Sequence, residues 1–292
     1  MSISSSIMSN GSASEQLVSG ESPLTRRDLS DIADMIYADA GIFLNESKAS
    51  LVYSRLSKRL RKIGLSSFRQ YCELVGSDRG AEERREMLSQ LTTNFTKFYR
   101  ERHHFEHLAS DVLPALISRA KAGGRVRIWS SACSLGHEPY SLAMTILSVF
   151  PDAAKYDFRL LASDIDPKVV ASASEGIYTT DAIEPVGQQF RKEYFNDLGL
   201  GKYQVKDHVR DLISFRELNL IANWPFKGKF DVIFCRNVVI YFNDPTQAKI
   251  WQRYSDVLLK DGYLYIGHSE RLSGPAKARF NNVGVTAFRF EG

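Results

Sequence analysis

The pattern of apolar and polar positions divides the chain into a helical part and an α/β part. Between residues 23 and 92, apolar side chains recur at helical spacing, as Leu56, Leu60 and Ile63 do at i, i+4 and i+7. Four short segments of this kind predict a small all-helical domain. Residues 1–22 are rich in Ser, Gly and Asn and show no periodicity, so a disordered tail is expected there.

After residue 103, short apolar runs alternate with amphipathic segments. This alternation is typical of a parallel sheet with helices on both faces. It predicts an α/β domain over residues 125–292, reached through a linker and helix over residues 93–124. The predicted strands are residues 125–132, 157–166, 230–235, 263–270 and 286–292, and the predicted helices are residues 139–150, 166–178 and 244–262, the last ending at Gly262.

The stretch between Tyr178 and Ser214 is too long for a single crossover helix. Its second part, GKYQVKDHVRDLISF, alternates like short strands joined by polar turns. We therefore predict a small antiparallel β insert at about residues 188–213.

Composition restricts the class of protein. The chain has no run of about 18 apolar residues that would form a membrane-spanning helix, and its N-terminus has no secretory signal pattern. Its three cysteines are scattered and form no CxxC pair, which predicts a cytoplasmic protein without disulfides or a zinc site. His103 and His104 are adjacent and should project in different directions from a helix, so no metal is expected.

The polar end of one predicted strand marks a candidate site. Phe230–Cys235 is an apolar run that suits a fully buried strand, and Arg236, Asn237 and Tyr241 follow it directly. In an open α/β sheet, ligands bind at the carboxyl ends of the strands. A merely polar loop is the alternative, and this stretch alone does not decide between the two.

The loops after the first two strands indicate the ligand. The first loop, SSACSLGHEPY, has a single glycine and matches neither GxGxxG nor a P-loop, while Glu138 would repel a phosphate and suit a cation. Asp164 ends the second strand, where a carboxylate can accept from ribose hydroxyls. Together these features favour S-adenosylmethionine over NAD or ATP. Separately, Glu138 could be a helix N-terminal charge and Asp164 a helix N-cap.

Several longer motifs resemble the CheR-type chemotaxis receptor methyltransferases. They are LTTNFTKFYRERHHF, WSSACSLGHEPYSLAM, LASDID, LNL, FDVIFCRNVVIYF and GHSE, in unbroken order over about residues 24–290. The resemblance implies an N-terminal helical domain joined to a Rossmann-like methyltransferase domain with a small antiparallel β insert. It also implies methyl transfer from S-adenosylmethionine to receptor glutamates, which yields γ-methyl esters and S-adenosylhomocysteine.

The same resemblance implies the site residues. Arg100 and Tyr241 are expected beside the transferred methyl group. The chain departs from the family at His137, where the family commonly has an acidic residue, but Glu138 keeps its position. The cofactor contacts implied by the family are Asn94, Thr96, Arg100, Glu138, Asp164, Asn219, Leu220, Arg236 and Asn237.

A basic segment is the candidate docking surface. Residues 47–72 contain seven Lys and Arg and no Asp or Glu, whereas the whole chain has a net charge of only +4. A solvated helix face is the ordinary meaning of such a run, but its single sign favours a surface for an acidic receptor helix. The residues expected to dock there are Arg55, Lys58, Arg59 and Lys62.

The sequence also bears on other partners and functions. The compact insert favours a protein that does not bind a C-terminal receptor pentapeptide, and no surplus apolar helix face indicates an oligomer, so a monomer is expected. A nucleic-acid methyltransferase is one alternative, but no aromatic residues are interleaved with the basic run. A non-catalytic S-adenosylmethionine sensor is the other alternative.

Overall fold

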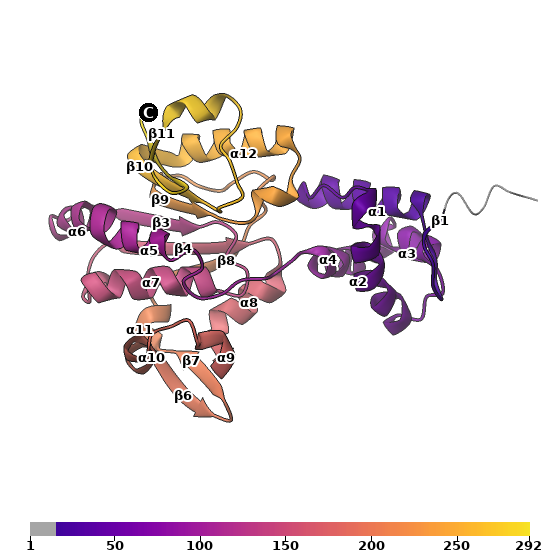
Figure 1. Ribbon diagram of the computed structural model, residues 1–292, viewed down its shortest axis with the longest axis horizontal. Helices are drawn as coiled ribbons and strands as arrows, with labels where there is room; N and C mark the ends of the chain where they lie inside the picture. Colours follow the sequence, from indigo (N-terminus) through magenta and orange to yellow (C-terminus); the bar gives the residue numbers. More distant parts are fainter. Residues whose placement is uncertain (1–15) are drawn as a thin grey trace, which may run out of the picture. The chain divides into compact units, whose positions relative to one another are not determined.

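The computed structural model describes residues 16–292 and separates into two compact units, which meet in the sequence at Thr93 and Asn94 (Figure 1). The first unit is helical and the second is an α/β unit. Among the described residues, no helix is both long enough and apolar enough to cross a membrane.

The helical unit encloses a core of its own. Leu56 and Leu60 are buried in it, as the helical spacing predicts, whereas Ile63 is only partly buried; Ile32, Ile36 and Val52 also belong to this core. Its elements are β1 (Gln16–Val18), β2 (Leu24–Thr25), α1 (Arg26–Ala40), η1 (Glu46–Lys48), α2 (Ala49–Lys62), α3 (Phe68–Val75), η2 (Asp78–Gly80) and α4 (Ala81–Leu91).

Local signals explain where these helices begin and end. Thr25 and Asp28 form a capping box at the start of α1, since each side chain bonds the backbone N–H of the other. Gly64, just after α2, has φ of +75°, the left-handed conformation that glycine adopts without cost. The tail expected over residues 1–22 is wrong for Gln16–Val18, which pairs with β2, and residues 1–15 lie outside the described part.

The α/β unit is built on a seven-stranded sheet with strand order β11-β12-β10-β9-β3-β4-β8. The five strands from β10 to β8 are parallel, whereas β12 and β11 form an antiparallel edge. The strands are β3 (Val126–Ser130), β4 (Phe158–Asp164), β8 (Ile213–Glu217), β9 (Phe230–Cys235), β10 (Leu258–Ile266), β11 (Phe280–Gly284) and β12 (Ala287–Phe290).

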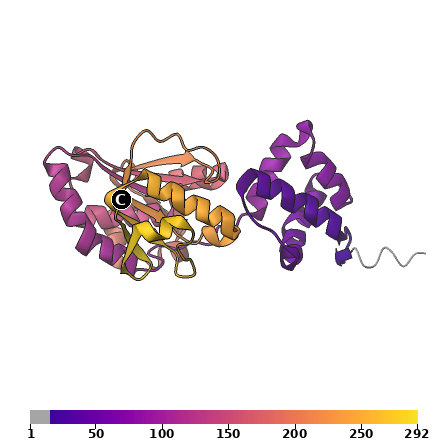
Figure 2. The ribbon, with the colours of Figure 1, turned by 90° about the horizontal axis from the view of Figure 1, so that it is seen from above.

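Helices flank this sheet on both sides. In Figure 1, α12 lies on one side of the strands, and α7 and α8 lie on the other; Figure 2 gives the view at right angles. The chain leaves β3 toward β4 and leaves β9 toward β10, in opposite directions along the sheet, so the strand order reverses between β3 and β9. The helices are α5 (His103–His107), η3 (Leu108–Val112), α6 (Leu113–Lys121), α7 (His137–Val149), η4 (Ala153–Lys155), α8 (Pro167–Glu175), α12 (Asp244–Val257) and η6 (Pro275–Arg279).

The predicted insert is a three-stranded antiparallel sheet of order β5-β7-β6. Tyr178 anchors it to the α/β core, because its hydroxyl donates to the carbonyl oxygen of Leu135 at 2.7 Å. The insert comprises β5 (Ile177–Thr179), α9 (Thr180–Ile183), α10 (Gln188–Tyr194), β6 (Phe195–Gly199), β7 (Lys202–Val205) and α11 (Asp207–Arg210).

Three details differ from the sequence prediction. The insert begins at Ile177 rather than near residue 188, and Ile213–Glu217 pairs with β4 in the central sheet. Gly262 does not end a helix, because α12 stops at Val257 and β10 already starts at Leu258. The sequence does not predict the edge strand Phe280–Gly284, because two adjacent Asn residues break the apolar pattern of FNNVG and the strand is mostly exposed.

Candidate cofactor site at the carboxyl edge of the sheet

The central strand β9 presents Arg236 at its carboxyl end. Every residue of Phe230–Cys235 is buried, because β9 has a neighbouring strand on each side and helices on both faces. Its largely apolar composition follows from that position, and its one charged residue, Asp231, is paired with Arg119. Arg236 is also buried, which requires its charge to be paired.

Two carboxylates pair with this guanidinium. Arg236 Nη1 donates to Glu138 Oε2 at 2.9 Å, and Arg236 Nη2 lies 3.2 Å from Glu101 Oε2. Arg236 also donates to the backbone carbonyl of Arg100. The second oxygen of Glu138 accepts from the Ser130 hydroxyl at 2.7 Å. We call Glu101, Glu138 and Arg236 the buried triad; it joins the first turn of α7, the end of β9 and the segment that holds Arg100.

The environment shifts the pKa values of Glu101 and Glu138 in opposite directions. Burial alone would raise the pKa of Glu101, but the charge of Arg236 and hydrogen bonds from His268 outweigh it and lower that pKa to about 2. Burial raises the pKa of Glu138, and the charge of Arg236 opposes that effect. The ion pair with Arg236 favours the ionised form of both carboxyls at neutral pH.

Asp164 lies where the sequence placed it, at the carboxyl end of β4. Its Oδ2 accepts from the backbone N–H of Ser134 at 2.8 Å, and its Oδ1 accepts from that of Asp166 at 3.1 Å. The N-cap of α8 is Asp166, whose side chain accepts from Lys168 N–H, so capping does not account for Asp164. Each Asp164 oxygen keeps lone-pair capacity for a further donor, such as a ribose hydroxyl.

The segment around Arg100 has an unusual backbone. Tyr99 and Glu101 both adopt positive φ, of 52° and 57°, although neither is glycine. Such conformations cost energy and persist where the surroundings hold them, often at functional sites. Arg100 Nη1 donates to the carbonyl oxygen of Phe95 at 3.1 Å, and its guanidinium lies 5.8 Å from the centre of the Phe95 ring.

Glu270 organises the loop that follows β9. Its Oε1 accepts from the N–H groups of Val238 and Val239 at 2.8 and 2.9 Å. Its Oε2 accepts from those of Gly267 and Asn237 at 2.6 and 3.0 Å. Burial raises the pKa of this carboxyl, and the four donors oppose the shift. The same loop contains Asn237 at φ of +59°, so Glu270 supports a strained backbone at the end of β9.

The remaining predicted residues lie on the loop after β8, in the short helix after β9 and on the segment before Arg100. The loop after β8 contains Asn219 and Leu220, and Arg253 of α12 donates to the carbonyl oxygen of Leu220 at 2.6 Å. Tyr241 ends the short 3₁₀ helix η5 (Val239–Tyr241) and is half-buried. Asn94 precedes the Arg100 segment, and its carbonyl oxygen accepts from the Ser134 hydroxyl at 3.2 Å. Thr96 follows it in the same loop.

Sequence reasoning missed three residues of this site. Glu101 was overlooked beside Arg100, and Ser130 was read only as part of a strand. Glu270 stood inside the GHSE motif without an assigned role. Each is an acid or a hydroxyl at or near the end of a predicted strand or beside a predicted site residue, which is the signal that could have found it.

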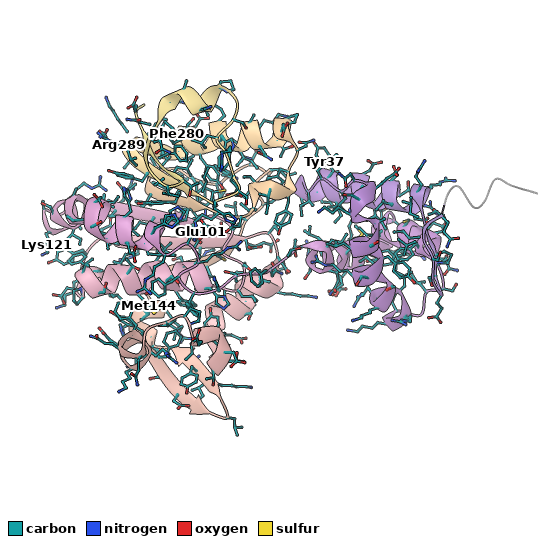
Figure 3. The ribbon with its side chains drawn as sticks, viewed as in Figure 1. Tyr37, Glu101, Lys121, Met144, Phe280 and Arg289 are labelled. Atoms are coloured by element: carbon teal, nitrogen blue, oxygen red, sulfur yellow. The ribbon has the colours of Figure 1, made fainter. Side chains whose placement is uncertain are left out.

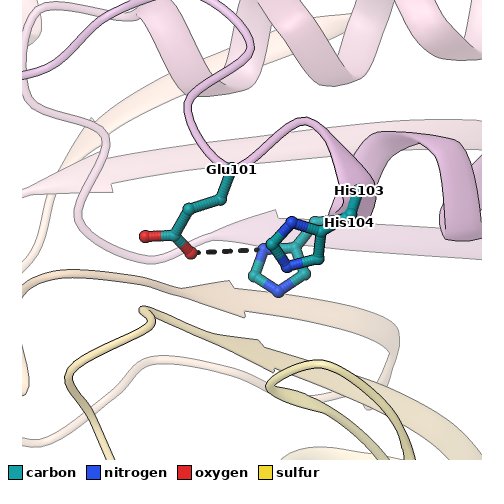
Figure 4. A group of neighbouring side chains, drawn as sticks. All are labelled: Glu101, His103 and His104. Atoms are coloured by element: carbon teal, nitrogen blue, oxygen red, sulfur yellow. Dashed lines mark ion pairs between the residues drawn. The ribbon is translucent and has the colours of Figure 1, made fainter.

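Glu101 also lies beside two histidines (Figure 4). The expectation that His103 and His104 project in different directions is wrong, because their ring centroids are 4.2 Å apart. Burial and the charge of Arg236 lower the pKa of His104 to about 3, so this ring is neutral at pH 7. His104 Nδ1 lies 3.7 Å from Glu101 Oε2. The atoms of the three residues that could ligate a metal lie within 4.8 Å of one another. The positive charge beside Glu101 is supplied by Arg236.

These residues fit S-adenosylmethionine. Figure 3 places Glu101 within the α/β unit, among the strands that carry the site. The buried triad has two carboxylates and one guanidinium, which leaves a negative charge suited to a ligand with a cationic centre. Asp164 retains acceptor capacity for a ribose.

The basic cluster of the helical unit has two kinds of members. Arg55 donates to the carbonyl oxygens of Leu91 and Thr92, each at 2.8 Å, and thereby caps the end of α4. Arg59 bonds Glu83 through Nε at 2.9 Å. Lys58 and Lys62 are exposed. The four basic side chains line a surface hollow of about 320 Å³ together with Ser54, Glu86 and Gln90.

Comparison with known protein families assigns the helical unit and the α/β unit to two domains of one family. Residues 27–92 match the all-alpha domain of CheR methyltransferases, and residues 94–289 match their S-adenosylmethionine-binding domain.

Three curated relatives are similar over most of the chain. A probable chemotaxis protein methyltransferase of Rhizobium etli is 63% identical over 259 residues, which cover 88% of this chain and 97% of the relative. Chemotaxis protein methyltransferase 2 of Pseudomonas aeruginosa is 39% identical over a region that covers 90% of this chain and 93% of the relative. The chemotaxis protein methyltransferase of Escherichia coli is 38% identical, with 88% of each chain covered. The predictions of fold class and cofactor are therefore confirmed, and the chain belongs to the CheR family of S-adenosylmethionine-dependent methyltransferases.

Proposed function

We propose that this protein transfers a methyl group from S-adenosylmethionine to glutamate side chains of chemotaxis receptors, forming γ-methyl esters. The observation that carries the proposal is the buried triad at the carboxyl end of β9, and the similarity of the chain to chemotaxis protein methyltransferases supports it. When bound, S-adenosylmethionine supplies a methyl group on a sulfonium that becomes a neutral thioether. One carboxylate oxygen forms the new bond to the methyl carbon as the carbon–sulfur bond breaks.

The acceptor needs no general base. A glutamate with an ordinary pKa of about 4.3 is already ionised at neutral pH. The chain must therefore position the carboxylate in line with the methyl group and shield the reaction from water. Accordingly, His104, an imidazole 3.7 Å from Glu101, has a pKa of about 3 and bonds the backbone of Val285 and the hydroxyl of Thr286.

Arg100 and Tyr241 are the proposed catalytic residues. The guanidinium of Arg100 can hold the acceptor carboxylate, and its single hydrogen bond to Phe95 leaves other N–H donors for that task. The strained residues on both sides of Arg100 support a fixed position for its backbone. Tyr241 follows the β9 loop that Glu270 holds, and its hydroxyl can orient an acceptor oxygen.

The proposed cofactor contacts are made by Glu138, Asp164 and Arg236 together with five further residues, which are Asn94, Thr96, Asn219, Leu220 and Asn237. Each lies on a loop near the carboxyl edge, and several of these loops are bonded to one another. The role of His137 is packing, because it is buried against Phe98 and Tyr178 and burial lowers its pKa to about 4. It is neutral at physiological pH, so its departure from the family pattern adds no charge.

The receptor helix is proposed to dock on the basic cluster of the helical unit. Lys58 and Lys62 carry the exposed charges for an acidic helix, while Arg55 and Arg59 also support the fold through α4. This division matters for any test, because reversal of the arginines would disrupt the helical unit itself.

The other partners follow from the same proposal. The protein acts as a monomer on the cytoplasmic part of the receptor and does not act on nucleic acid. It does not require a C-terminal receptor pentapeptide, since the insert turn is short, with Gly199 and Gly201 around Leu200. Calorimetry with such a pentapeptide should show no binding at micromolar concentration; micromolar affinity would overturn this part.

The decisive experiment is transfer of labelled methyl from S-adenosylmethionine to a receptor cytoplasmic fragment. Label that is released as methanol by mild alkali identifies a carboxyl methyl ester. The fragment with its acceptor glutamates changed to alanine should take up no label. Stable label, or none with several receptor fragments despite cofactor binding, contradicts the proposed function.

A further inference from the structure

The buried triad does not balance its charge. Glu101 and Glu138 each pair with Arg236, at 3.2 and 2.9 Å, so two carboxylates share one guanidinium. The side chain of Arg236 is 2% exposed and those of both acids are 12% exposed, so solvent screens their charges weakly.

The side chains packed around Glu101 do not cancel the excess negative charge. His104 is neutral at pH 7, since burial and Arg236 lower its pKa to about 3. His268 Nδ1 lies 2.9 Å from Glu101 Oε1, but that ring is largely exposed, so solvent screens its interaction with Glu101. Glu101 itself stays ionised, because Arg236 and His268 lower its pKa to about 2.

Donor and product differ in charge at the reacting atom. S-adenosylmethionine carries a sulfonium, whereas S-adenosylhomocysteine carries a neutral thioether and therefore one positive charge less. A buried negative charge favours the first ligand over the second, and this preference falls when the negative charge is removed.

We propose that Glu101 is a selectivity residue of the cofactor site: as the second carboxylate on Arg236, it leaves one uncompensated negative charge that favours the sulfonium-bearing donor over the neutral product. Glu138 alone satisfies the guanidinium, and it is bonded to Ser130 as well. Glu101 is therefore not needed to neutralise Arg236. The inference rests on the proposed cofactor site but not on the identity of the methyl acceptor.

Glu101→Gln is the informative substitution. Glutamine has nearly the same shape, and its single carbonyl oxygen can accept either from the His268 N–H that now bonds Glu101 Oε1 or from Arg236, which lies against Oε2. Arg236 keeps its ion pair with Glu138, so no buried charge is left unpaired. The matched control is Glu106→Gln, which removes an exposed carboxylate paired with Arg102 five residues further along the same segment.

The measurement is the pair of dissociation constants for S-adenosylmethionine and S-adenosylhomocysteine, by calorimetry on the full chain at about pH 8. We expect Glu101→Gln to weaken donor binding relative to product binding by about threefold to tenfold. Glu106→Gln should leave the ratio unchanged, and Glu101→Asp, which keeps the charge, should restore most of it. Equal weakening of both ligands would indicate a purely structural role and overturn the proposal.

The unmodified chain provides a second test that does not depend on a folded variant. An analogue with a protonated amine in place of the sulfonium should bind more tightly than an analogue of the same shape with a neutral carbon there. Equal binding of the two analogues would overturn the proposal. Neither measurement uses a receptor, so a wrong methyl acceptor would leave both results intact.

Discussion

Single residues at the carboxyl edge act mainly by holding backbone and charge in place. Glu270 is the clearest case, because its carboxylate accepts four backbone N–H bonds from two different loops. Glu101 joins Arg236 to His268 in the same way through side chains. Neither was assigned a role from the sequence, yet the positions of Arg236, Asn237 and Arg100 depend on them.

Replacing Glu270 by glutamine should damage the β9 loop. The amide has one acceptor atom, and its NH₂ group would face backbone donors, so at least one buried N–H would lose its partner. Each such loss costs about 1–3 kcal/mol. We expect affinity for S-adenosylmethionine to fall by at least about tenfold, measured by calorimetry. Glu291→Gln, an exposed change at the chain end, is the control; wild-type affinity in Glu270→Gln would contradict the bracing role.

The low pKa of Glu101 predicts that the free energy of unfolding falls at acid pH. Its pKa of about 2 in the folded protein lies below the ordinary value for glutamate, so its interactions stabilise the fold above that value and are lost as pH falls toward 2. The contribution is at most about 3 kcal/mol. Urea unfolding at pH 5 and pH 3 should show a smaller stability loss for Glu101→Gln than for the wild type. Equal losses would argue against the shift, and Glu106→Gln should behave as wild type.

At the scale of elements, side chains of helices hold the loops and the helix ends of other elements. Arg253 of α12 donates to the loop after β8, and Arg55 of α2 donates to the last carbonyls of α4. Helix ends leave such carbonyls without partners inside the helix, so a side chain from another element stabilises them. The four candidate docking residues, which the sequence presents as alike, therefore divide into two supporting arginines, Arg55 and Arg59, and two exposed lysines, Lys58 and Lys62.

This division can be tested within the helical unit. Arg55→Ala should remove the bonds to Leu91 and Thr92 and lower local stability by about 1–3 kcal/mol. Hydrogen exchange of the α4 amides in the full chain should then become faster. Lys58→Ala removes a basic side chain from the next turn of α2 and should leave exchange unchanged. Similar exchange in both variants would show that Arg55 does not brace α4.

At the scale of the whole molecule, chemistry and docking are assigned to different units. The α/β unit carries the cofactor site, and the helical unit carries the proposed docking surface. Each unit has its own hydrophobic core, so substitutions on one surface should leave the other unit folded. Docking and cofactor binding can therefore be separated experimentally.

Reversing the exposed lysines should affect the receptor alone. The double substitution Lys58→Glu and Lys62→Glu is expected to lower kcat/KM for receptor methylation by about tenfold at low salt, and less at high salt. The dissociation constant for S-adenosylmethionine should not change. Lys227→Glu with Lys229→Glu makes the same change in charge on the α/β unit as a control. Equal loss in both double variants would argue against a specific docking surface.

The sequence by itself determined the order and type of most elements. Helical spacing placed Leu56 and Leu60 on one buried helix face, and the largely apolar run Phe230–Cys235, whose one charged residue is Asp231, identified the central strand. These inferences held because the period of a helix or strand is a local property. The family motifs likewise lie within short segments, and they identified the methyltransferase and its cofactor.

Only the tertiary structure decided how residues distant in the sequence share charge and hydrogen bonds. Arg236 meets Glu138 and Glu101 across intervals of about a hundred residues or more, and Glu270 reaches back to the loop after β9. The boundary between α12 and β10 was also decided there, because pairing of Leu258 with Phe230 of β9 outweighs the signal of Gly262. Such partners are set by strand order and packing, which no local pattern encodes.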